Sequence, residues 1–484
     1  MPRSMWRLES SYAQLPDAFH ERAAPATFRA PRLVAFNQPL AAELGLDVPG
    51  ESEERLARVF GGQELPPGAN PIAQAYAGHQ FGHFAMLGDG RALLLGEQRT
   101  PDGRLVDLAF KGSGQTSYSR RGDGRAALGP MLRELVVGEA MHGLGIPTTR
   151  ALAVVATGEP VMREGMPPGA VLTRVAASHL RVGTFQYAAA WHGHLVRALA
   201  DYAIARHDPA LLDAPRPHLA FLRAVALRQA RLIARWQLVG FIHGVMNTDN
   251  TSISGETIDY GPCAFMDAYD PDTVFSSIDE GGRYRYSHQP AIGQWNLARL
   301  AEALLPLLAP KEEPAIEAAH EVLDEYRVVH EREWLAGMRA KLGLAMAEDG
   351  DRALVDELLA RLHAARADWT IAFRALSTGA GLPLSLSVDP AFDAWMERWR
   401  ARAAREGRSI EAARAAMLRV NPAIIARNHR VEEALHAAER RNDLRPLHAL
   451  LDALRRPFDP TAADARYVEA PPASFKDYQT FCGT

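Results

Sequence analysis

The pattern of apolar and polar residues divides the chain into three parts. Over residues 1–70 the periodicity is broken by proline and alanine, which predicts an irregular N-terminal extension. Residues 71–176 contain short apolar runs separated by glycine, as in strands, around one helical stretch. Over residues 177–484 apolar residues recur at three- and four-residue spacing, which predicts helices with a polar loop at residues 242–262. The pattern therefore predicts an α+β protein.

The second part has a definite order of elements. Residues 84–87 (FAML) and 91–98 (RALLLGEQ) are predicted to form a hairpin, because the D-G pair between them favours a tight turn. LVDLAFK is predicted as a third strand that ends at Lys111. A helix then begins at Gly129-Pro130 and ends near Gly145, and two further strands follow.

This order is typical of a protein-kinase core. A glycine hairpin, a strand that ends in lysine, a helix, two strands and then mainly helices occur in the same sequence in that fold. We therefore expect a protein-kinase-like, two-lobed fold: a strand-rich N-lobe (71–176), a helical C-lobe and a helical C-terminal extension (177–484).

Composition indicates the cellular compartment of the protein and argues against some classes of ligand. Lys and Arg total 54 against 58 Asp and Glu, a net charge of −4, which argues against a nucleic-acid-binding protein. No stretch approaches the roughly 18 apolar residues of a membrane span, and the start MPRSMWRLES lacks the apolar run of a signal peptide. Only Cys263 and Cys482 are present, which favours a reducing compartment. We expect a cytoplasmic protein that binds neither membrane nor nucleic acid.

Two segments offer groups that bind phosphate. LAFK, ending at Lys111, resembles the V-A-I-K strand of kinases, whose lysine pairs with phosphates and with a glutamate on the next helix. Glu134 is the expected partner, and Glu139 on the same helix is the alternative. The segment 119–125 (SRRGDGR) places three arginines among glycines, which suits either phosphate oxygens or a solvated loop. Arg174 and Arg181 would add positive charge near the end of the last strand.

The polar loop carries the strongest local signal. HGVMNTDN matches the kinase catalytic loop H-R-D-L-x-x-x-N at His243 and Asn250, and Asp259 begins a D-Y-G triplet in the place of D-F-G. Asn250 and Asp259 supply the oxygen ligands that Mg²⁺ or Mn²⁺ requires. The position of the kinase base is Val245, which cannot accept a proton, so Asp249 is the candidate general base or a further metal ligand.

These segments together resemble the YdiU/selenoprotein O family. The resemblance is carried by AYAGHQFGHFAMLGDGR, FKGSGQTSYSRRGDGRA, EAMHGLGIPTTRALA and GVMNTDNTSISGETIDYGP. It implies a pseudokinase fold that binds ATP in a flipped orientation and transfers AMP to Ser, Thr or Tyr hydroxyls of proteins, with UMP transfer from UTP also ascribed to some members. It implies Asp249 as general base, Asn250 and Asp259 as ligands of Mg²⁺ or Mn²⁺, and as nucleotide contacts Gly88, Gly90, Arg91, Lys111, Asp123, Gly124, Arg174 and Arg181.

Two other functions stay open from the residues alone. An ordinary kinase would transfer the γ-phosphate to a protein or small molecule, and an inactive pseudokinase would only bind nucleotide. Val245 argues against the first, and the joint presence of Lys111, Asp249, Asn250 and Asp259 argues against the second. Cys482, third from the C-terminus, occupies the place of selenocysteine in some relatives, but two unpaired thiols are expected in a reducing compartment. A monomer is the expected state.

Overall fold

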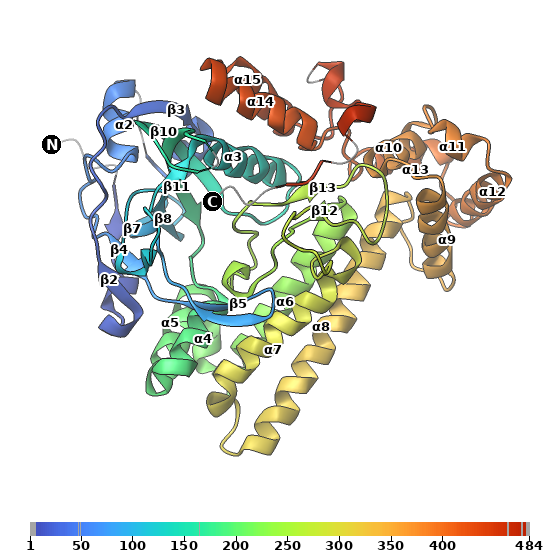
Figure 1. Cartoon of the computed structure of the whole chain (residues 1–484). Coiled ribbons are helices and arrows are strands. Elements are labelled where there is room, and N and C mark those ends of the chain that lie inside the picture. Colours follow the sequence, from blue (N-terminus) through green and yellow to red (C-terminus); the bar gives the residue numbers. More distant parts are fainter. Residues whose placement is uncertain are drawn as a thin grey trace.

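The computed structural model describes residues 6–480 except 47, 49, 164, 462, 463, 476 and 477. It is a mixed α/β structure, about half helical, with one large antiparallel sheet (Figure 1). The α+β class is confirmed to that extent, and the two-lobed kinase-like arrangement and the domain boundaries stay predictions. No helix in the described ranges is long and apolar enough to cross a membrane.

Within the described residues the large sheet has nine strands. Its main path runs β2-β4-β7-β8-β11-β10-β3, with β1 paired to β7 and β9 to β11, and every pairing is antiparallel. The strands of the middle of the sheet are almost wholly buried, which explains their continuous apolar runs. The nine are β1 (Leu8–Glu9), β2 (His20–Arg22), β3 (Arg32–Phe36), β4 (Ile72–Gln74), β7 (Ala92–Arg99), β8 (Leu105–Lys111), β9 (Ala126–Ala127), β10 (Arg150–Pro160) and β11 (Pro168–Ala176).

The first 70 residues belong to this sheet, so the irregular structure expected for them is wrong. They contribute β1, β2 and β3 and two helices, α1 (Gln38–Glu43) and α2 (Glu53–Phe60). The three strands have two to five residues each, too short to show a period of two. Their pairing with β7, β4 and β10, far along the chain, stabilises what the local sequence does not.

The expected hairpin around Gly88-Asp89-Gly90 is also wrong. The strand before this turn, β6 (His83–Met86), pairs with β5 (Ala77–Gln80) in a separate two-stranded sheet, whereas β7 pairs with β8, β4 and β1. The actual hairpin turn is Phe81-Gly82, with φ of 50° and 89° at the two residues, as tight hairpin turns require. Gly88-Asp89-Gly90 instead connects the two sheets.

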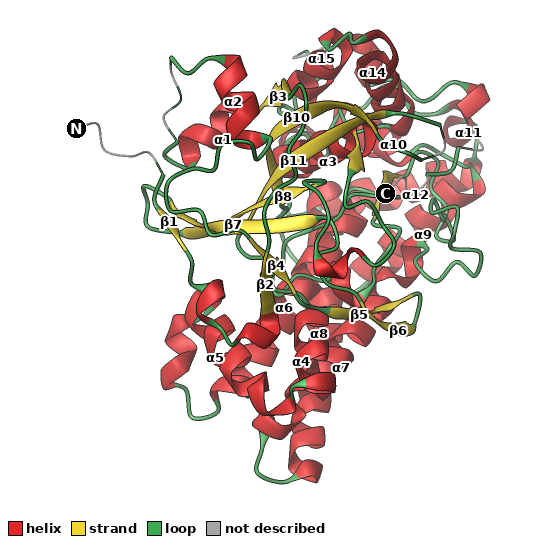
Figure 2. Cartoon of the chain, turned by 60° about the vertical axis from the view of Figure 1, so that its left-hand side comes forward, coloured by secondary structure: helices red, strands yellow, loops and turns green. Residues whose placement is uncertain are grey.

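The remaining elements follow the predicted order. The strand ending at Lys111 is β8, the helix after it is α3 (Leu128–Gly143), and the two strands that follow are β10 and β11. Figure 2 shows the long helices below the sheet. A short antiparallel pair, β12 (Phe241–Ile242) and β13 (Ala264–Phe265), lies at the two ends of the polar loop (Figure 1). The helices are α4 (Val182–Trp191), α5 (Val196–His207), α6 (Pro217–Leu238), α7 (Gln289–Leu308) and α8 (Glu312–Lys341).

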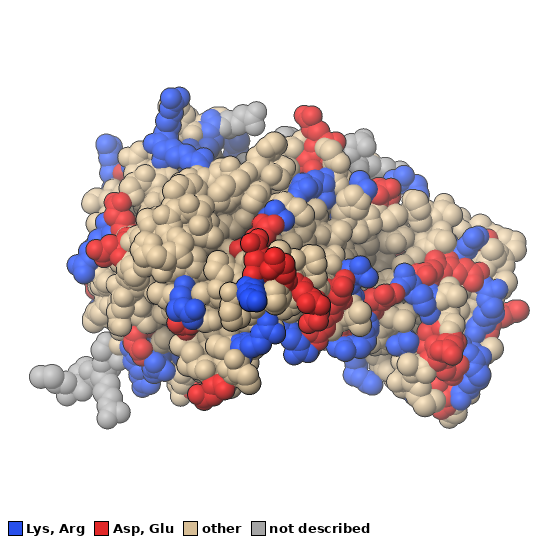
Figure 3. Space-filling model, turned by 90° about the horizontal axis from the view of Figure 1, so that it is seen from below, with Lys and Arg blue, Asp and Glu red and all other residues tan. Residues whose placement is uncertain are grey.

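The C-terminal helices form two groups. The first group, α9 to α13, packs around a second apolar core that includes Trp369, Trp395 and Trp399. The other two helices lie against α3 at the top of Figure 1. On the face seen in Figure 3, the described Lys and Arg side chains are interspersed with Asp and Glu rather than joined into one basic surface. The helices are α9 (Asp351–Ala364), α10 (Trp369–Thr378), α11 (Leu384–Ser387), α12 (Pro390–Ala404), α13 (Ile410–Met417), α14 (Asn428–Arg441) and α15 (Arg445–Leu454).

Candidate active site

A cleft of about 1240 Å³ opens between the sheet and the helical part of the chain. Its lining mixes backbone of glycine-rich loops with charged side chains, as expected where a charged ligand binds. Two of the predicted residues, Arg174 and Arg181, are buried beside it and contact its acidic residues. The other predicted residues all line it: Gly88, Gly90, Arg91, Lys111, Asp123, Gly124, Glu134, Asp249, Asn250 and Asp259.

A network of two cations and two carboxylates lies at the centre of the cleft. Lys111, at the end of β8, donates to Glu134 on α3, and its Nζ lies 2.5 Å from Asp259 Oδ1. Arg174 on β11 lies 3.1 Å from the same Asp259 oxygen and 3.7 Å from Glu134. Glu139, the alternative partner of Lys111, points elsewhere and pairs with arginine. The lysine–glutamate pair is therefore Lys111–Glu134.

Asp259 is held ionised by its neighbours. Burial disfavours its charge, but Lys111, Arg174 and Arg181 overcome this effect and hold the pKa of the carboxyl well below its usual range. Its backbone has a φ of 66°, a left-handed conformation that is uncommon outside glycine and is found at functional sites. The side chain is 27% exposed, so a carboxylate at the cleft wall remains accessible.

The loop that carries Asp249 and Asn250 has unsatisfied oxygen atoms. Asp249 Oδ1 and Asn250 Oδ1 are both buried without a hydrogen-bond partner. Gln80 Nε2 lies 3.5 Å from the other oxygen of Asp249, and Asn250 donates to the carbonyl of Val245 over 3.1 Å. Burial raises the pKa of Asp249 to about 6, against the opposing effect of Arg181.

These oxygens fit a divalent cation. Buried carboxylate and amide oxygens without partners are the hard donors that Mg²⁺ and Mn²⁺ prefer. Among the described residues no cluster of three or more His, Cys, Asp or Glu side chains is suited to a metal. An ion held by Asn250 and Asp259 would therefore complete its coordination with ligand oxygens or water, as is usual for Mg²⁺.

His243 has a structural position. It is 1% exposed; its Nε2 lies 2.9 Å from the carbonyl oxygen of Ile258, and its Nδ1 accepts from the backbone N–H of Val245. These contacts connect the start of the polar loop to the chain just before Asp259. The histidine thus joins the two segments that carry the acidic groups.

The glycine-rich segments pack closely against each other. A side chain at Gly88 would collide with the ring of Tyr118, and one at Gly124 would collide with the backbone of Gly114. Asp123 forms a two-point ion pair with Arg163 at 3.0 Å, which holds the pKa of this carboxyl below its usual range. Arg163 belongs to none of the sequence motifs.

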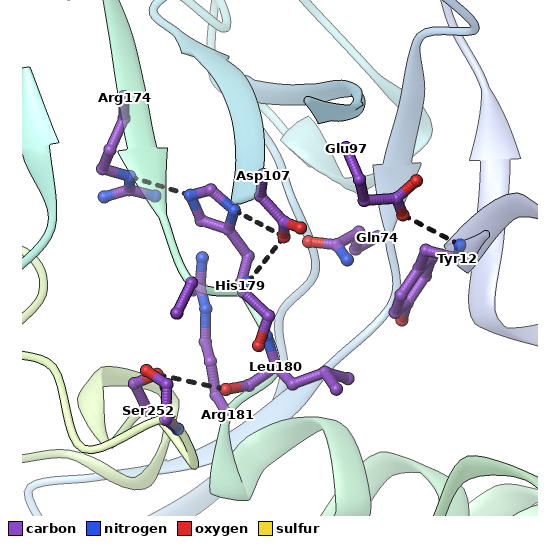
Figure 4. Close-up of polar contacts among 12 residues, drawn as sticks. Tyr12, Gln74, Glu97, Asp107, Arg174, His179, Leu180, Arg181 and Ser252 are labelled. Atoms are coloured by element: carbon purple, nitrogen blue, oxygen red, sulfur yellow. Dashed lines mark hydrogen bonds and ion pairs between the residues drawn. The ribbon is translucent and has the colours of Figure 1, made fainter. Parts of the chain in front are cut away.

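A buried chain of polar groups behind Arg174 was missed as well (Figure 4). His179 Nε2 accepts from Arg174 Nε at 3.2 Å, and its Nδ1 and backbone N–H lie 3.0 and 2.8 Å from Asp107 Oδ2. Arg206 pairs with the second oxygen of Asp107 at 2.8 Å. A charged residue inside the apolar strand LVDLAFK was the available signal for Asp107, whereas nothing local distinguishes His179. Arg181 is similarly supported, with its guanidinium 4.4 Å above the ring of Tyr76.

Of the two cysteines, the structure describes Cys263 only. Cys263 is a buried free thiol, and burial raises its pKa to about 11, which disfavours the reactive thiolate. Cys482 lies outside the described residues, so the expectation of two unpaired thiols stays a prediction.

Comparison with known proteins gives a consistent result along the whole chain. The family model described as protein adenylyltransferase SelO matches residues 2–455. The chain is similar to proteins named protein nucleotidyltransferase YdiU: 57% identical to that of Geobacillus kaustophilus, over 99% of both chains. It is 58% identical to that of Cereibacter sphaeroides and 54% to that of Agrobacterium fabrum, each over 99% of this chain and 100% of the relative.

The protein is thus an enzyme of the nucleotidyltransferase class. Within that class, the chain belongs to the SelO family, also named YdiU. The family predicted from the sequence motifs is confirmed.

Proposed function

We propose that this protein transfers AMP from ATP to Ser, Thr or Tyr hydroxyls of other proteins and releases pyrophosphate. UTP is the alternative donor, which would give UMP transfer. The observation that carries the proposal is the joint presence, in one cleft, of the Lys111–Glu134–Asp259–Arg174 network and the unsatisfied carboxylate of Asp249. The proposed architecture is kinase-like, with the sheet and α3 as the smaller lobe and the helices from α4 onward as the larger one.

The nucleotide phosphates are assigned to the cationic and glycine-rich groups. Lys111, held by Glu134, and Arg174 would neutralise charge that develops on the leaving pyrophosphate. Arg181, beneath the Asp249 loop, would do the same from the other side. Backbone N–H groups approach phosphate closely only where no side chain intervenes, which suits the closely packed Gly88, Gly90 and Gly124. Arg91 and Asp123 complete the set of predicted contacts along the lining.

Asn250 and Asp259 would hold the Mg²⁺ or Mn²⁺ ion. When bound, such an ion neutralises phosphate charge and fixes the phosphate geometry. Asp259 is suited to this position because its neighbouring cations keep it ionised. Because Lys111 and Arg174 contact the same Asp259 oxygen, both cations would lie close to phosphates bound by the ion.

Asp249 is assigned as the general base. Val245, at the usual base position of kinases, has no side-chain proton acceptor, whereas Asp249 lines the cleft and has one carboxylate oxygen without a hydrogen-bond partner. The carboxylate would take the proton of the incoming hydroxyl as that oxygen attacks the α-phosphorus and the bond to pyrophosphate breaks. The shifted base position supports attack at a different phosphorus from that used by kinases, as the family name also does. We assign the protein to the cytoplasm, as a monomer.

Label transfer from ATP tests the proposal. Purified protein, divalent metal and a protein acceptor are incubated in parallel with ATP labelled at the α- or the γ-phosphate. We expect protein-bound label from α-labelled ATP alone. Asp259→Ala should abolish it, whereas Asp208→Ala, which removes a carboxylate paired with Arg228 away from the cleft, should not. Label from γ-labelled ATP alone would mean a kinase, and no label despite ATP binding would mean a scaffold.

A further inference from the structure

The β5–β6 hairpin forms a wall beside the proposed base. The backbone N–H of Phe81 donates to the side-chain oxygen of Asn247 at 3.1 Å, and Gln80 donates to Asp249 at 3.5 Å. A Cβ placed on Gly78 would lie only 2.5 Å from Asp249 Oδ1, so hairpin and catalytic loop are in direct contact. Gln80 is exposed and lines the cleft. The hairpin therefore bounds the cleft at Asp249.

Exposed aromatic side chains continue outward from the hairpin. Phe84 on β6 and Trp191 at the end of α4 are 43% and 49% exposed, and their rings stack at 5.7 Å. His79 on β5 joins them to Trp295 on α7, with ring centroids 4.9 Å from Phe84 and 5.1 Å from Trp295. We call Phe84, Trp191, His79 and Trp295 the aromatic face. Figure 2 shows β5 and β6 apart from the main sheet, over the helical part of the chain. These four residues do not belong to the cleft lining; His79 and Phe84 lie on the face of the hairpin opposite to Gln80. Contiguous exposed apolar groups are typical of binding surfaces.

Arg283 places a positive charge on the aromatic face. Its guanidinium lies 4.8 Å above the ring of Trp295 and beside the hairpin turn at Gly82. Among the described residues the contacts of its guanidinium are with the aromatic rings of Trp295 and Tyr284, at 4.8 and 5.7 Å, and its buried Nε has no hydrogen-bond partner. The carboxylate of the nearby Asp279 is directed to the backbone instead: its two oxygens accept from the N–H groups of Arg283 and Tyr284 at 2.9 and 2.8 Å. A flat cation supported by an aromatic ring is suited to a carboxylate from another molecule.

We propose that the aromatic face and Arg283 together form the docking surface for the acceptor polypeptide. Arg283 binds an Asp or Glu side chain of the acceptor, the aromatic rings cover an apolar residue next to it, and the hydroxyl is thereby directed past Gln80 to Asp249. This inference rests on the proposed function, and it adds a substrate class: hydroxyl-bearing segments with acidic and apolar neighbours. Complementary charge fixes the register of such a segment, and apolar burial supplies affinity.

Peptide binding tests the docking surface without requiring transfer. The probes are two fluorescein-labelled peptides with one Ser beside Leu, the first flanked by Glu and the second by Gln at the same positions. Fluorescence anisotropy with the full-length protein gives the Kd of each. We expect the Glu peptide to bind about tenfold more tightly, the value of one charge-assisted hydrogen-bonded pair at a partly exposed site. Arg283→Gln should abolish this difference, Arg283→Lys should keep part of it, and Phe84→Ser should weaken both peptides.

A matched arginine provides the control. Arg352 also lies over a tryptophan, 5.1 Å from the ring of Trp334, but on another part of the surface and paired with Glu331 and Asp356. Arg352→Gln should leave both Kd values unchanged. Equal binding of the two peptides by the unmodified protein, or a preference that survives Arg283→Gln, would overturn the docking surface.

The docking surface and the proposed function can fail separately. Arg283-dependent peptide binding without transfer of α-label would refute the proposed reaction and leave the surface intact. Transfer of α-label to the Glu peptide with the same KM in Arg283→Gln would refute the surface and leave the reaction intact.

Discussion

His179 is expected to position Arg174 in the nucleotide site, although it does not reach the cleft itself. Its imidazole accepts from Arg174 and lies 3.0 Å from Asp107, so the proton must be on the nitrogen that faces the carboxylate. Burial lowers the pKa of His179, which keeps the ring neutral and able to accept. We predict that His179→Ala loosens Arg174 and thereby weakens ATP binding.

The magnitude follows from the contacts that remain. The substitution removes two side-chain hydrogen bonds with charged partners, each worth about 1.5–3 kcal/mol. Asp107 keeps Arg206 at 2.8 Å, and Arg174 keeps Asp259 at 3.1 Å, so neither charge is left without a partner. We therefore expect a loss of about 3 kcal/mol in the free energy of unfolding. With one of its anchors gone, Arg174 should bind phosphate less well, raising the KM for ATP about tenfold.

A substitution at a second buried histidine, His218, serves as a control that distinguishes an effect on ATP binding from a general loss of stability. His218 is 5% exposed and lies 2.7 Å from a carboxylate oxygen of Asp201, but its contacts do not connect to Arg174. His218→Ala should also lower the Tm, by removing a buried ring and its contact with Asp201, and leave the KM for ATP unchanged. His179→Gln, which keeps an acceptor near Arg174, should recover part of the ATP affinity. If His179→Ala and His218→Ala change the KM equally, the positioning role is refuted.

The pH dependence of stability gives an independent check on His179. Because the folded-state pKa is lowered, the neutral ring contributes stability above the ordinary value of about 6.5. That contribution is lost as the pH falls below this value towards the lowered pKa. His179→Gln should therefore lose less stability than the unmodified protein when the pH is lowered through this range, as measured by denaturant unfolding.

Three further perturbations follow from the same structure. Lys341 is 3% exposed, 4.0 Å above the ring of Phe373, and burial lowers its pKa to about 7. The energetic cost of burying its charge therefore grows as the pH falls towards that value. Lys341→Met should raise the Tm by roughly 2–4 °C, with a larger increase at low than at high pH. Equal increases at low and high pH would contradict this reasoning. Gly124→Ala, at a φ of +65° and against backbone, should lower the Tm and weaken ATP binding, whereas Gly103→Ala, at +87° but in open space, should affect the Tm alone. Asn250→Leu should raise the metal concentration for half-maximal transfer at least about tenfold, and unchanged metal dependence would exclude Asn250 as a ligand.

Local sequence was sufficient for much of the framework. The strand that ends at Lys111, helix α3, strands β10 and β11 and the helical character of the second half all follow from runs of apolar residues with one period. The candidate base and metal ligands followed from two short motifs, and Asp249, Asn250 and Asp259 do line one cleft. Such features are predictable because the residues that define them are neighbours in the chain.

The pairing of distant segments was decided only by the tertiary structure. The sequence offered both Glu134 and Glu139 to Lys111, and the packing of α3 against the sheet directs only Glu134 to it. The partner of β6 is the preceding β5, and the short N-terminal strands are stable only because β7, β4 and β10 supply hydrogen bonds to them. The role of His179 depends on the meeting of β8, β11 and the loop after β11, because its partners Asp107 and Arg174 lie on those two strands. The sequence by itself thus determined which groups are available for chemistry, and the fold decided which of them meet, because long-range hydrogen bonds and burial leave no local period in the chain.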